Sequence, residues 1–508
     1  MKNLKKIIYL LSPQEIKQAI LLLIMFVIMA LVEMIGIASI IPFIAVLSNP
    51  DVIDTNVYLN LIFQSLNRFN INTKNDFFFI MGLFIFILFI LSLCVKAFTT
   101  YFLMKFTSMC EFSIGKRYIE RYLHQPYSWF LNRNSAELGK TILSEVQIII
   151  NNGIRPMGIF ISYIIIVFML LFLVIYVEPK IAIITCLSLS IIYFLIYKLV
   201  GNFLNKIGQE SFDANQKRFT AASEAFGSPK EVKLGGLEQV FIDRFSSSSK
   251  IFARHQALAI IISQIPRFAV EGIAFGGILI LILYLILEKN GFINAIPIIT
   301  LYAFVGYRML PALQQIYSSI TQLRFVTPSL EALYDDLKNI EPISNINNEK
   351  KILDLKNSIK LNHIYFNYPN KPNNVLTDVS LSIRAFSTVG FVGSTGSGKT
   401  TLVDIILGLL DPKKGTLEVD GKIIDKHNKR AWQNSLGYVP QQIYLIDNTI
   451  AANIAFGVNK EDFNYSRIEQ VSKIAKLHDF VLNELPQKYE TYVGERGIRL
   501  SGGQRQRI

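Results

Sequence analysis

The stretch Gly393-Ser-Thr-Gly-Ser-Gly-Lys399-Thr400 has the residue types and spacing of a loop that holds nucleotide phosphates. Its glycines would let backbone N–H groups approach an anion closely, and a following helix would add its N-terminus. Lys399 is expected to reach the β- and γ-phosphates, and the Thr400 hydroxyl is expected to hold Mg²⁺. A strand at residues 389–392 and a helix from Thr401 onward would position the loop. The predicted phosphate-binding residues are Gly393, Ser394, Thr395, Gly396, Ser397, Gly398, Lys399, Thr400 and Thr401.

A second glycine motif follows in Leu500-Ser501-Gly502-Gly503-Gln504. By itself, a serine followed by two glycines is only a loop. At this distance from a phosphate-binding loop, the stretch resembles the signature of ATP-binding cassettes. The resemblance implies that Ser501, Gly502, Gly503 and Gln504 close over ATP that is held by the loop of a partner subunit. One loop and one signature per chain then imply a dimer, and we expect the partner to be identical.

Two further positions match that family. Tyr368, in Phe366-Asn-Tyr-Pro, lies where cassettes place an aromatic ring that stacks on adenine. Gln441, in Tyr438-Val-Pro-Gln, lies where a glutamine meets Mg²⁺ and the membrane domain. Alone, such a tyrosine more often serves packing and such a glutamine more often faces solvent, but the order and spacing of the motifs favour the functional interpretation. ATP and Mg²⁺ are the expected ligands, with Thr400 and Gln441 as the metal-binding residues.

Residues 493–497, Val-Gly-Glu-Arg-Gly, resemble the exporter branch of this family, in which one membrane domain precedes one cassette. The resemblance implies short coupling helices in two cytoplasmic loops, for which residues 127–134 and 224–233 are the candidates. It also places a strand ending in Asp-Glu, and then a histidine, behind the signature. The sequence ends at Ile508 before them, so no catalytic residue is assigned. We expect a partial sequence that does not itself hydrolyse ATP, because Mg²⁺ and the attacking water would lack these carboxylates.

The part of the chain that precedes these motifs is predicted to lie in a membrane. Of the 508 residues 51% are hydrophobic and the mean hydropathy is +0.37, which is high for a water-soluble protein. A membrane-spanning helix needs about 20 apolar residues. The segments that meet or approach this length are residues 20–47, 77–104, 157–177, 181–204, 257–287 and 295–323. The expected fold class is an all-α, six-helix transmembrane domain of the exporter type, followed by an α/β P-loop NTPase domain that is incomplete at its C-terminus.

Polarity along the chain gives the expected domain boundaries. Residues 1–17 predict a short basic helix on the membrane surface, 18–337 the transmembrane domain, 338–357 a linker and 358–508 the cassette. The long polar loops carry many more Lys and Arg residues than residues 48–76, so the positive-inside rule makes them cytoplasmic. Both termini are then cytoplasmic, and we expect a multi-pass protein of a bacterial inner membrane.

Other classes of function are disfavoured by composition. The net charge of +13 comes from dispersed Lys and Arg residues without a basic run interleaved with aromatics, so nucleic acid is not an expected partner. The cysteines Cys94, Cys110 and Cys186 are far apart and mostly lie in apolar stretches. They predict neither a disulfide framework nor a metal site.

The substrate candidates are cations inside the apolar spans, namely Lys96, Arg267 and Arg308. Charges inside a membrane are costly and suggest function, here a basic lining for a phosphate or pyrophosphate head group. The structural alternatives are that Lys96 extends to the interface, that Arg267 pairs with Glu271, and that an arginine pairs with Glu33. The sequence leaves both interpretations open.

Two stretches narrow the class of substrate. Glu33-Met-Ile-Gly-Ile-Ala-Ser-Ile-Ile-Pro-Phe and Ser228-Pro-Lys-Glu-Val-Lys-Leu resemble bacterial flippases that move lipid-linked oligosaccharides. The resemblance implies a subunit that uses ATP to translocate such a lipid, or a similar amphipathic substrate, among membrane lipids. A peptide or drug exporter is the alternative within transport, and it would favour an apolar or acidic cavity. A non-transporting, ATP-gated regulator or channel is the alternative from another class.

Overall fold

The computed structural model describes residues 2–66, 73–177, 179–268, 271–272, 275–277, 279–280, 283, 292–341, 351–368 and 373–508. For residues 2, 65, 66, 180–182, 184–197, 199 and 292–298 it describes the backbone alone. The chain divides into two compact units, Met1–Asn345 and Ile346–Ile508.

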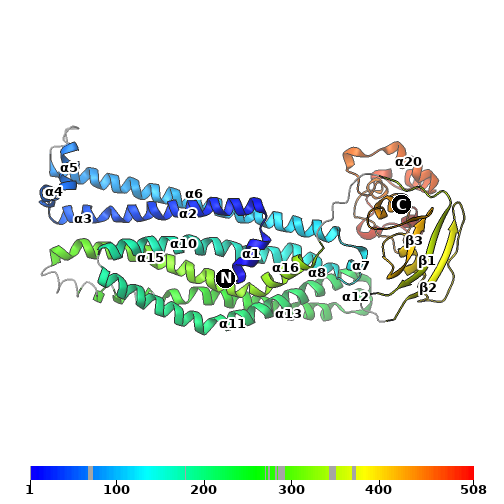
Figure 1. Ribbon diagram of the computed structural model, residues 1–508, viewed down its shortest axis with the longest axis horizontal. Coiled ribbons are helices and arrows are strands. Elements are labelled where there is room, and N and C mark those ends of the chain that lie inside the picture. The colour runs from blue at the N-terminus through cyan, green and yellow to red at the C-terminus, as the bar shows by residue number, and fades with distance from the viewer. Residues whose placement is uncertain are drawn as a thin grey trace. The chain divides into compact units, whose positions relative to one another are not determined.

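The first unit is built from helices. Its elements in chain order are α1 (Lys2–Leu10), α2 (Pro13–Ala38), α3 (Ile40–Ser48), α4 (Val52–Thr55), α5 (Val57–Leu66), α6 (Lys74–Leu123), α7 (Tyr127–Phe130), α8 (Ser135–Lys140), η2 (Thr141–Glu145), α9 (Val146–Ile149), η3 (Ile150–Ile154), α10 (Arg155–Val177), α11 (Pro179–Gly227), α12 (Pro229–Gly235), α13 (Glu238–Gln264), α15 (Phe292–Phe325) and α16 (Thr327–Asn339). The segments η2 and η3 are π-helical. The long helices of this unit lie side by side, with α10 against α2 and α15, and α11 against α13 (Figure 1).

Several helices are long and apolar enough to cross a membrane. Within the described residues these are the continuous helical stretches Pro13–Ser48, Lys74–Leu123 and Ser135–Val177, which contain the first three predicted spans. The fourth and sixth predicted spans lie in α11 and α15, whose side chains are described only in part. The fifth begins in α13, and much of its later part lies outside the described residues. The polar regions after the second and fourth spans begin as continuations of the membrane helices, because α6 and α11 are 50 and 49 residues long in all.

The first predicted span is not one straight helix. α2 ends at Ala38 and α3 begins at Ile40, with Ser39 between them. Pro42 has no N–H to donate to the carbonyl of Ala38, and the Ser39 hydroxyl donates to the Gly36 carbonyl at 2.8 Å. The helical hydrogen-bond ladder therefore lacks the bond from residue 42 to the Ala38 carbonyl, although the Ser39 N–H still donates to the Ile35 carbonyl at 3.0 Å.

The two predicted coupling helices correspond to short helices with shifted bounds. α7 occupies the first part of residues 127–134. α12 begins only at Pro229, and residues 224–227 are the last turn of α11. Pro229 suits the first turn of a helix because its N–H would be unpaired there, and Gly236, at a φ of +61°, ends the helix in the left-handed conformation.

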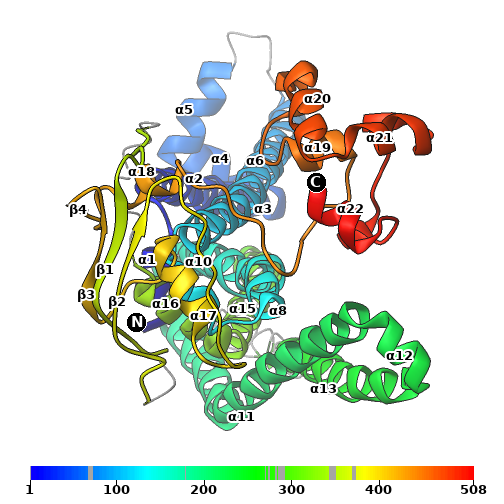
Figure 2. The same ribbon diagram turned by 90° about the vertical axis from the view of Figure 1, so that its right-hand side faces the viewer.

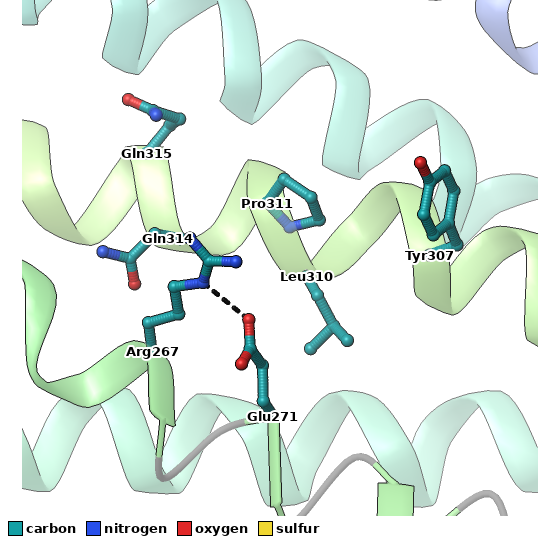
Figure 3. Close-up of a pocket in the computed structure, with 7 residues that line it drawn as sticks. All are labelled: Arg267, Glu271, Tyr307, Leu310, Pro311, Gln314 and Gln315. Carbon is teal, nitrogen blue, oxygen red and sulfur yellow. Dashed lines mark hydrogen bonds and ion pairs between the residues drawn. The ribbon is translucent and has the colours of Figure 1, made fainter.

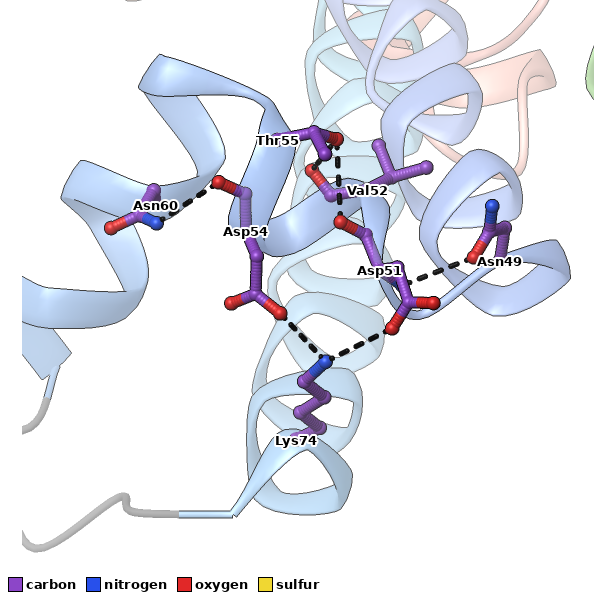
Figure 4. Close-up of polar contacts among 7 residues, drawn as sticks. All are labelled: Asn49, Asp51, Val52, Asp54, Thr55, Asn60 and Lys74. Carbon is purple, nitrogen blue, oxygen red and sulfur yellow. Dashed lines mark hydrogen bonds and ion pairs between the residues drawn. The ribbon is translucent and has the colours of Figure 1, made fainter.

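Polar contacts hold the segment between α3 and α6 (Figure 4). Lys74, at the start of α6, places its Nζ atom 3.4 Å from Asp51 and 2.9 Å from Asp54. The Asn60 side chain of α5 donates to the Asp54 carbonyl at 3.4 Å. These exposed pairs add little free energy, but they fix where the short helices sit on the first turn of α6.

α16 is tied to α6 and to the residues after α7. The Tyr118 hydroxyl donates to the Leu333 carbonyl at 2.5 Å, and the Tyr122 hydroxyl donates to Asp336 at 2.6 Å. Arg133 pairs with the same carboxylate at 2.9 Å. The last helix of the first unit is thus positioned by the segment that carries the first coupling helix.

The second unit combines an antiparallel sheet with a helical part, which Figure 2 shows in yellow and in orange to red. Its elements are β1 (Ser358–Phe366), β2 (Leu376–Arg384), α17 (Lys399–Ile406), β3 (Lys414–Val419), β4 (Lys422–Ile423), α18 (Lys429–Gln433), α19 (Ile450–Ile454), η4 (Lys460–Asp462), α20 (Tyr465–Ile474), α21 (His478–Glu484), η5 (Lys488–Glu490), η6 (Glu495–Gly497) and α22 (Gly502–Arg507). The strand order is β2-β1-β3-β4, and each pair is antiparallel. One core surrounds Ile364 and Trp432 beneath α17, and a separate core surrounds Ile450 and Val481 in the helical part.

The strand predicted at residues 389–392 is absent from the described structure. These residues, and residues 436–440 before Gln441, have no ladder partner. A strand requires a neighbour for its N–H and C=O groups. Among the described residues no segment pairs with residues 389–392, and Val392 is 94% exposed. The prediction of a strand here is wrong for this structure, because the apolar pattern is present without its pairing partner.

Candidate functional site

The phosphate-binding motif forms a tight loop that ends in α17. Gly396 and Gly398 have φ values of +84° and +87°, which side-chain-bearing residues rarely adopt. A Cβ atom at Gly398 would also lie 2.8 Å from Leu376 Cδ2, and one at Gly393 would lie 2.8 Å from Ser397 Oγ. The backbone conformation therefore favours glycine at Gly396 and Gly398, whereas a side chain at Gly393 would have to displace the Ser397 hydroxyl.

Lys399 and the two threonines occupy the first turn of α17. The Lys399 Nζ atom donates to the carbonyls of Gly393 and Ser394 at 2.8 Å each, so the ammonium group lies against the loop. Thr400 is exposed, whereas Thr401 is buried. A helix N-terminus, a lysine and glycine N–H groups at one place form a site that favours a polyphosphate anion.

Tyr368 is brought to this loop from the chain that follows β1. Its hydroxyl lies 3.0 Å from Thr401 Oγ1, and its ring packs edge-on against Phe366 with centroids 5.1 Å apart. Tyr368, predicted to bind adenine, is therefore adjacent to the helix that holds the phosphate loop.

Buried groups fix α17 on the sheet. The indole N–H of Trp432 donates to the Ile406 carbonyl at 2.8 Å, and Ile405 belongs to the buried core. Burial raises the pKa of Asp404, which lies on the same helix. The loop thus leads into a helix whose C-terminal end is hydrogen-bonded to the Trp432 side chain of α18.

The signature residues lie in the other part of the unit. The Ser501 hydroxyl accepts from the Gln504 N–H at 3.3 Å, and the Gln504 side chain accepts from the Ser501 N–H at 2.8 Å, which together form a capping box at the start of α22. Leu500 packs in the core of the helical part, away from the core beneath α17. Gln441 is exposed on the connecting segment. The structure therefore brings Tyr368 and the loop together, but it does not join Gln441 or the signature to them.

The residues at the loop fit a magnesium-bound triphosphate. Among the described residues no cluster of three His, Cys, Asp or Glu side chains could hold a metal by itself. The exposed Thr400 hydroxyl on the first turn of α17 is a suitable single ligand, and the remaining ligands would come from phosphate oxygens and water. Mg²⁺ bound in this way would neutralise phosphate charge.

Two of the substrate candidates contact other side chains of the helical unit, and for Arg308 the partner is the Glu33 that the sequence left open. Arg308 Nη1 lies 3.1 Å from Glu33 Oε1, inside the helical unit. Lys96 lies over the ring of Tyr163, with its Nζ atom 5.6 Å from the centroid. Both cations are therefore engaged within their own subunit.

Arg267 has a different environment, which Figure 3 shows. Its Nε atom donates to Glu271 Oε1 at 2.6 Å, but its side chain is 60% exposed. It lines a pocket of about 260 Å³ with Glu271, Tyr307, Leu310, Pro311, Gln314 and Gln315. Gln314 donates to the Ser263 carbonyl at 2.9 Å, and its Oε1 atom is buried without a partner among the described residues.

The sequence did not identify Tyr307, Gln314 or Gln315 as candidates. One feature of the sequence could have identified the two glutamines. They are adjacent, they follow Pro311 by one helical turn, and they lie close to the end of an apolar span. Helical periodicity alone does not show that these residues face Arg267, because that residue lies on another helical segment.

Comparison with known proteins gives two family matches. Residues 19–307 match the ABC transporter transmembrane region, and residues 376–508 match the ABC transporter family. Among solved structures, a bacterial Atm1-family ABC exporter with ATP bound has a TM-score of 0.73 at 18% identity, covering 97% of this chain and 82% of that chain. This likeness concerns the fold.

Curated relatives match different shares of the chain. HepA of Nostoc, a heterocyst differentiation ATP-binding protein, is 26% identical over 83% of this chain and 69% of its own. The ATP-dependent lipid A-core flippase of Cupriavidus metallidurans is 25% identical over 77% of this chain and 65% of its own. YgaD of Bacillus subtilis, whose name marks it as a candidate multidrug export ATP-binding/permease protein, is 36% identical over 41% of this chain. The chain spans only 36% of the length of YgaD.

Proposed function

The chain belongs to the ABC transporter family, as an exporter of the half-transporter type, and on this basis we propose that it is a subunit of an ATP-driven flippase. The flippase would couple ATP binding and hydrolysis to translocation of a lipid-linked oligosaccharide or a similar amphipathic substrate. The observation that carries the substrate proposal is the open pocket around Arg267, where a guanidinium group, a phenol and two amides lie beside apolar side chains.

The nucleotide is proposed to bind at the loop of one subunit and the signature of another. Lys399 and the loop N–H groups would hold the phosphates, and Tyr368 would stack on the base. The chain does not bring its own signature to its own loop, which supports completion of the site by a second, identical subunit. Binding of Mg-ATP would then draw two cassettes together.

Exposed apolar residues near α12 support contact with a partner cassette. Phe226 is 81% exposed and Leu234 is 90% exposed, at either side of the turn that contains Pro229. A pocket of about 520 Å³ lies beside them between α11, α12 and α13. Large exposed apolar side chains that gather beside a pocket on a soluble part of a protein often mark a site where another chain binds.

The Arg267 pocket suits a head group with both charge and hydrogen-bonding groups. The guanidinium group has N–H donors beyond the one bonded to Glu271, and these can pair with phosphate oxygens. Gln315 and Tyr307 can hydrogen-bond to hydroxyl or amide groups of a sugar. Leu310 and Pro311 offer an apolar surface to the rest of the substrate.

The test is reversal of the Arg267 charge in the full-length protein reconstituted in vesicles. Arg267→Glu should abolish flipping of a pyrophosphate-linked lipid and leave basal ATPase activity largely intact. Arg254→Glu, at an exposed position of α13, is the matched control and should retain flipping. Normal flipping by Arg267→Glu would reduce the Arg267–Glu271 pair to a structural feature.

A peptide or drug exporter remains the second candidate, because YgaD bears a multidrug export name. It would tolerate Arg267→Glu for neutral or cationic substrates. A non-transporting regulator would bind ATP without stimulation by any lipid. The proposed location is a bacterial inner membrane with both termini in the cytoplasm, and protease protection of tagged termini in oriented vesicles tests it.

A further inference from the structure

A buried polar cluster joins the segment after α7 to α11. Lys140 Nζ lies 3.5 Å from Glu145 Oε1, and the two side chains are 3% and 2% exposed. Asn215 donates to the same Glu145 oxygen at 2.8 Å and to Ser144 Oγ at 3.1 Å. The Lys140 cluster consists of four residues, Lys140, Glu145, Asn215 and Arg218. Neither the nucleotide loop nor the Arg267 pocket uses them.

The cluster continues along one face of α11 and reaches α13. Phe212, Asn215 and Arg218 follow each other at intervals of three, so they are neighbours on the helix surface. The Lys140 ammonium lies 3.9 Å from the centre of the Phe212 ring. Arg218 donates to Asn215 Oδ1 at 2.6 Å, and its guanidinium carbon lies 4.2 Å from the centre of the Phe252 ring. Three chain segments therefore meet at one polar centre.

These segments adjoin both short helices that were predicted to couple to the cassettes. α8, which follows α7, ends at Lys140, and α12 connects α11 with α13. Glu145 ends the π-helical segment η2, and a second π-helical segment, η3, follows at Ile150. π-helical turns inside α-helices are rare and are frequent at functional sites. The cluster therefore lies on the chain segments that lead to the two short helices.

The cluster is poorly arranged for stability alone. Removing two charges from water is costly, and a buried pair compensates for this only with close geometry and further hydrogen bonds. The Lys140–Glu145 pair is 3.5 Å apart, and Glu145 Oε2 is buried without a hydrogen-bond partner among the described residues. An apolar pair of similar volume would be expected to be at least as stable. Stability therefore does not account for these charges.

A second arrangement is available to Glu145. Its Oε1 atom is bonded to the Asn215 amide, and the carbonyl oxygen of that same amide holds Arg218. Arg218 is thus linked to the Glu145 carboxylate through one side chain, that of Asn215. A small displacement of α11 toward η2 would let Arg218 replace Lys140 as the partner of Glu145. Two discrete pairings around one carboxylate are the kind of bistable contact on which conformational switching depends.

We propose that Glu145 is a positioning residue that links the segment after α7 to α11, by exchanging between Lys140 and Arg218 when the cassettes bind nucleotide. The proposal rests on the proposed function, because it assumes short helices that respond to the cassettes. It assigns the Lys140 cluster to the coupling of ATP use to transport, separately from nucleotide binding and from substrate binding.

The test replaces the pair by apolar residues in the full-length protein. Lys140→Met/Glu145→Leu should keep or raise the melting temperature and retain at least half of the basal ATPase activity, while lipid flipped per ATP falls about tenfold or more. Lys116→Met/Glu120→Leu removes an exposed pair of the same residue types from α6 and should change none of the three values. Wild-type coupling in the Lys140→Met/Glu145→Leu protein overturns the proposal.

A second readout does not depend on the lipid substrate. Hydrogen–deuterium exchange at residues 141–154 should change when a non-hydrolysable ATP analogue and Mg²⁺ bind to the wild-type protein. The same response should be lost in the apolar variant, although the analogue still binds. If exchange responds in this way but no lipid is flipped by the wild type, the substrate proposal fails and the positioning role stands. An identical response in both proteins, or none in the wild type, overturns the positioning role.

Discussion

Arg308 Nη1 lies 3.1 Å from Glu33 Oε1, which joins α15 to α2 within the helical unit. The side chains are 14% and 4% exposed, and the Arg308 guanidinium carbon lies 5.2 Å from the centre of the Phe89 ring. The second oxygen of Glu33 is buried without a partner among the described residues. Glu33 therefore depends on a single cation, and this predicts how the pair responds to mutation.

Removal of the arginine alone should destabilise the protein. Arg308→Met leaves a buried carboxylate uncompensated, and loss of one partner of a buried pair costs about 3–5 kcal/mol. We expect a clearly lower melting temperature in detergent, with partial recovery in Glu33→Gln/Arg308→Met, where no unpaired charge is left. Arg267→Met breaks an exposed pair instead and should cost about 1 kcal/mol or less. Equal melting temperatures for Arg308→Met and Arg267→Met would contradict the assignment of Arg308 to a structural pair.

The nucleotide loop predicts separable effects on ATP binding and hydrolysis. In the full-length protein Lys399→Ala should abolish ATP hydrolysis, because the ammonium beside Gly393 and Ser394 is lost from the phosphates. Tyr368→Ala should weaken ATP binding about tenfold through loss of stacking, whereas Tyr368→Phe keeps the ring and loses only the contact with Thr401. Phosphate release and equilibrium binding of a fluorescent ATP analogue measure the two effects. Turnover in Lys399→Ala, or equal binding by Tyr368→Ala and the wild type, would show that the site is elsewhere.

The 508-residue polypeptide itself should bind ATP without hydrolysing it. The loop and Thr400 are present, but the sequence has no Asp-Glu pair after Gln504 to hold Mg²⁺ and polarise the attacking water. Phosphate release by the purified polypeptide should equal that of its Lys399→Ala variant. Release above that background would disprove this interpretation of the residues behind the signature.

A carboxylate in the sheet predicts a dependence of stability on pH. Asp420 accepts the backbone N–H groups of Lys356, Ser358 and Asn357 at 2.7, 2.8 and 2.7 Å, and these bonds hold the pKa of its carboxyl below the usual value of 3.8. A carboxyl whose pKa is lowered by folding adds stability above its unfolded pKa, and this stability is lost as pH falls through the lower folded pKa. Asp420→Asn should therefore unfold more easily at pH 7 and show a smaller loss of stability below about pH 4.

The Asp420 measurement can be restricted to the second unit. The chain has two tryptophans, Trp129 and Trp432, and Trp432 is buried beneath α17. In a Trp129→Phe background, urea unfolding followed by tryptophan fluorescence reports on the core beside the sheet. Asp447→Asn, at an exposed loop position, is the control. Parallel pH curves for Asp420→Asn and its parent would be inconsistent with the predicted role.

Local patterns were sufficient for the family, the nucleotide loop and the early membrane helices. A phosphate-binding loop is encoded in consecutive residues, because its glycines, Lys399 and Thr400 act through the backbone of one turn. The spans are likewise readable from composition, since each helix in lipid must satisfy its own backbone. The Arg267–Glu271 pair lay within one turn of a helix and was an open alternative for that reason.

Contacts between distant segments were decided only by the tertiary structure. The partner of Arg308 is far away in sequence, and the pocket that contains Gln314 combines two helical segments. Burial of Lys140 and Glu145 depends on α11, which no local period reveals. Residues 389–392 have the apolar pattern of a strand but do not form one in the structure. Such a pattern becomes a strand only when another segment pairs with it. Sequence periodicity specifies which face of an element is apolar, whereas the partner of each polar group is fixed by the packing of elements that are remote along the chain.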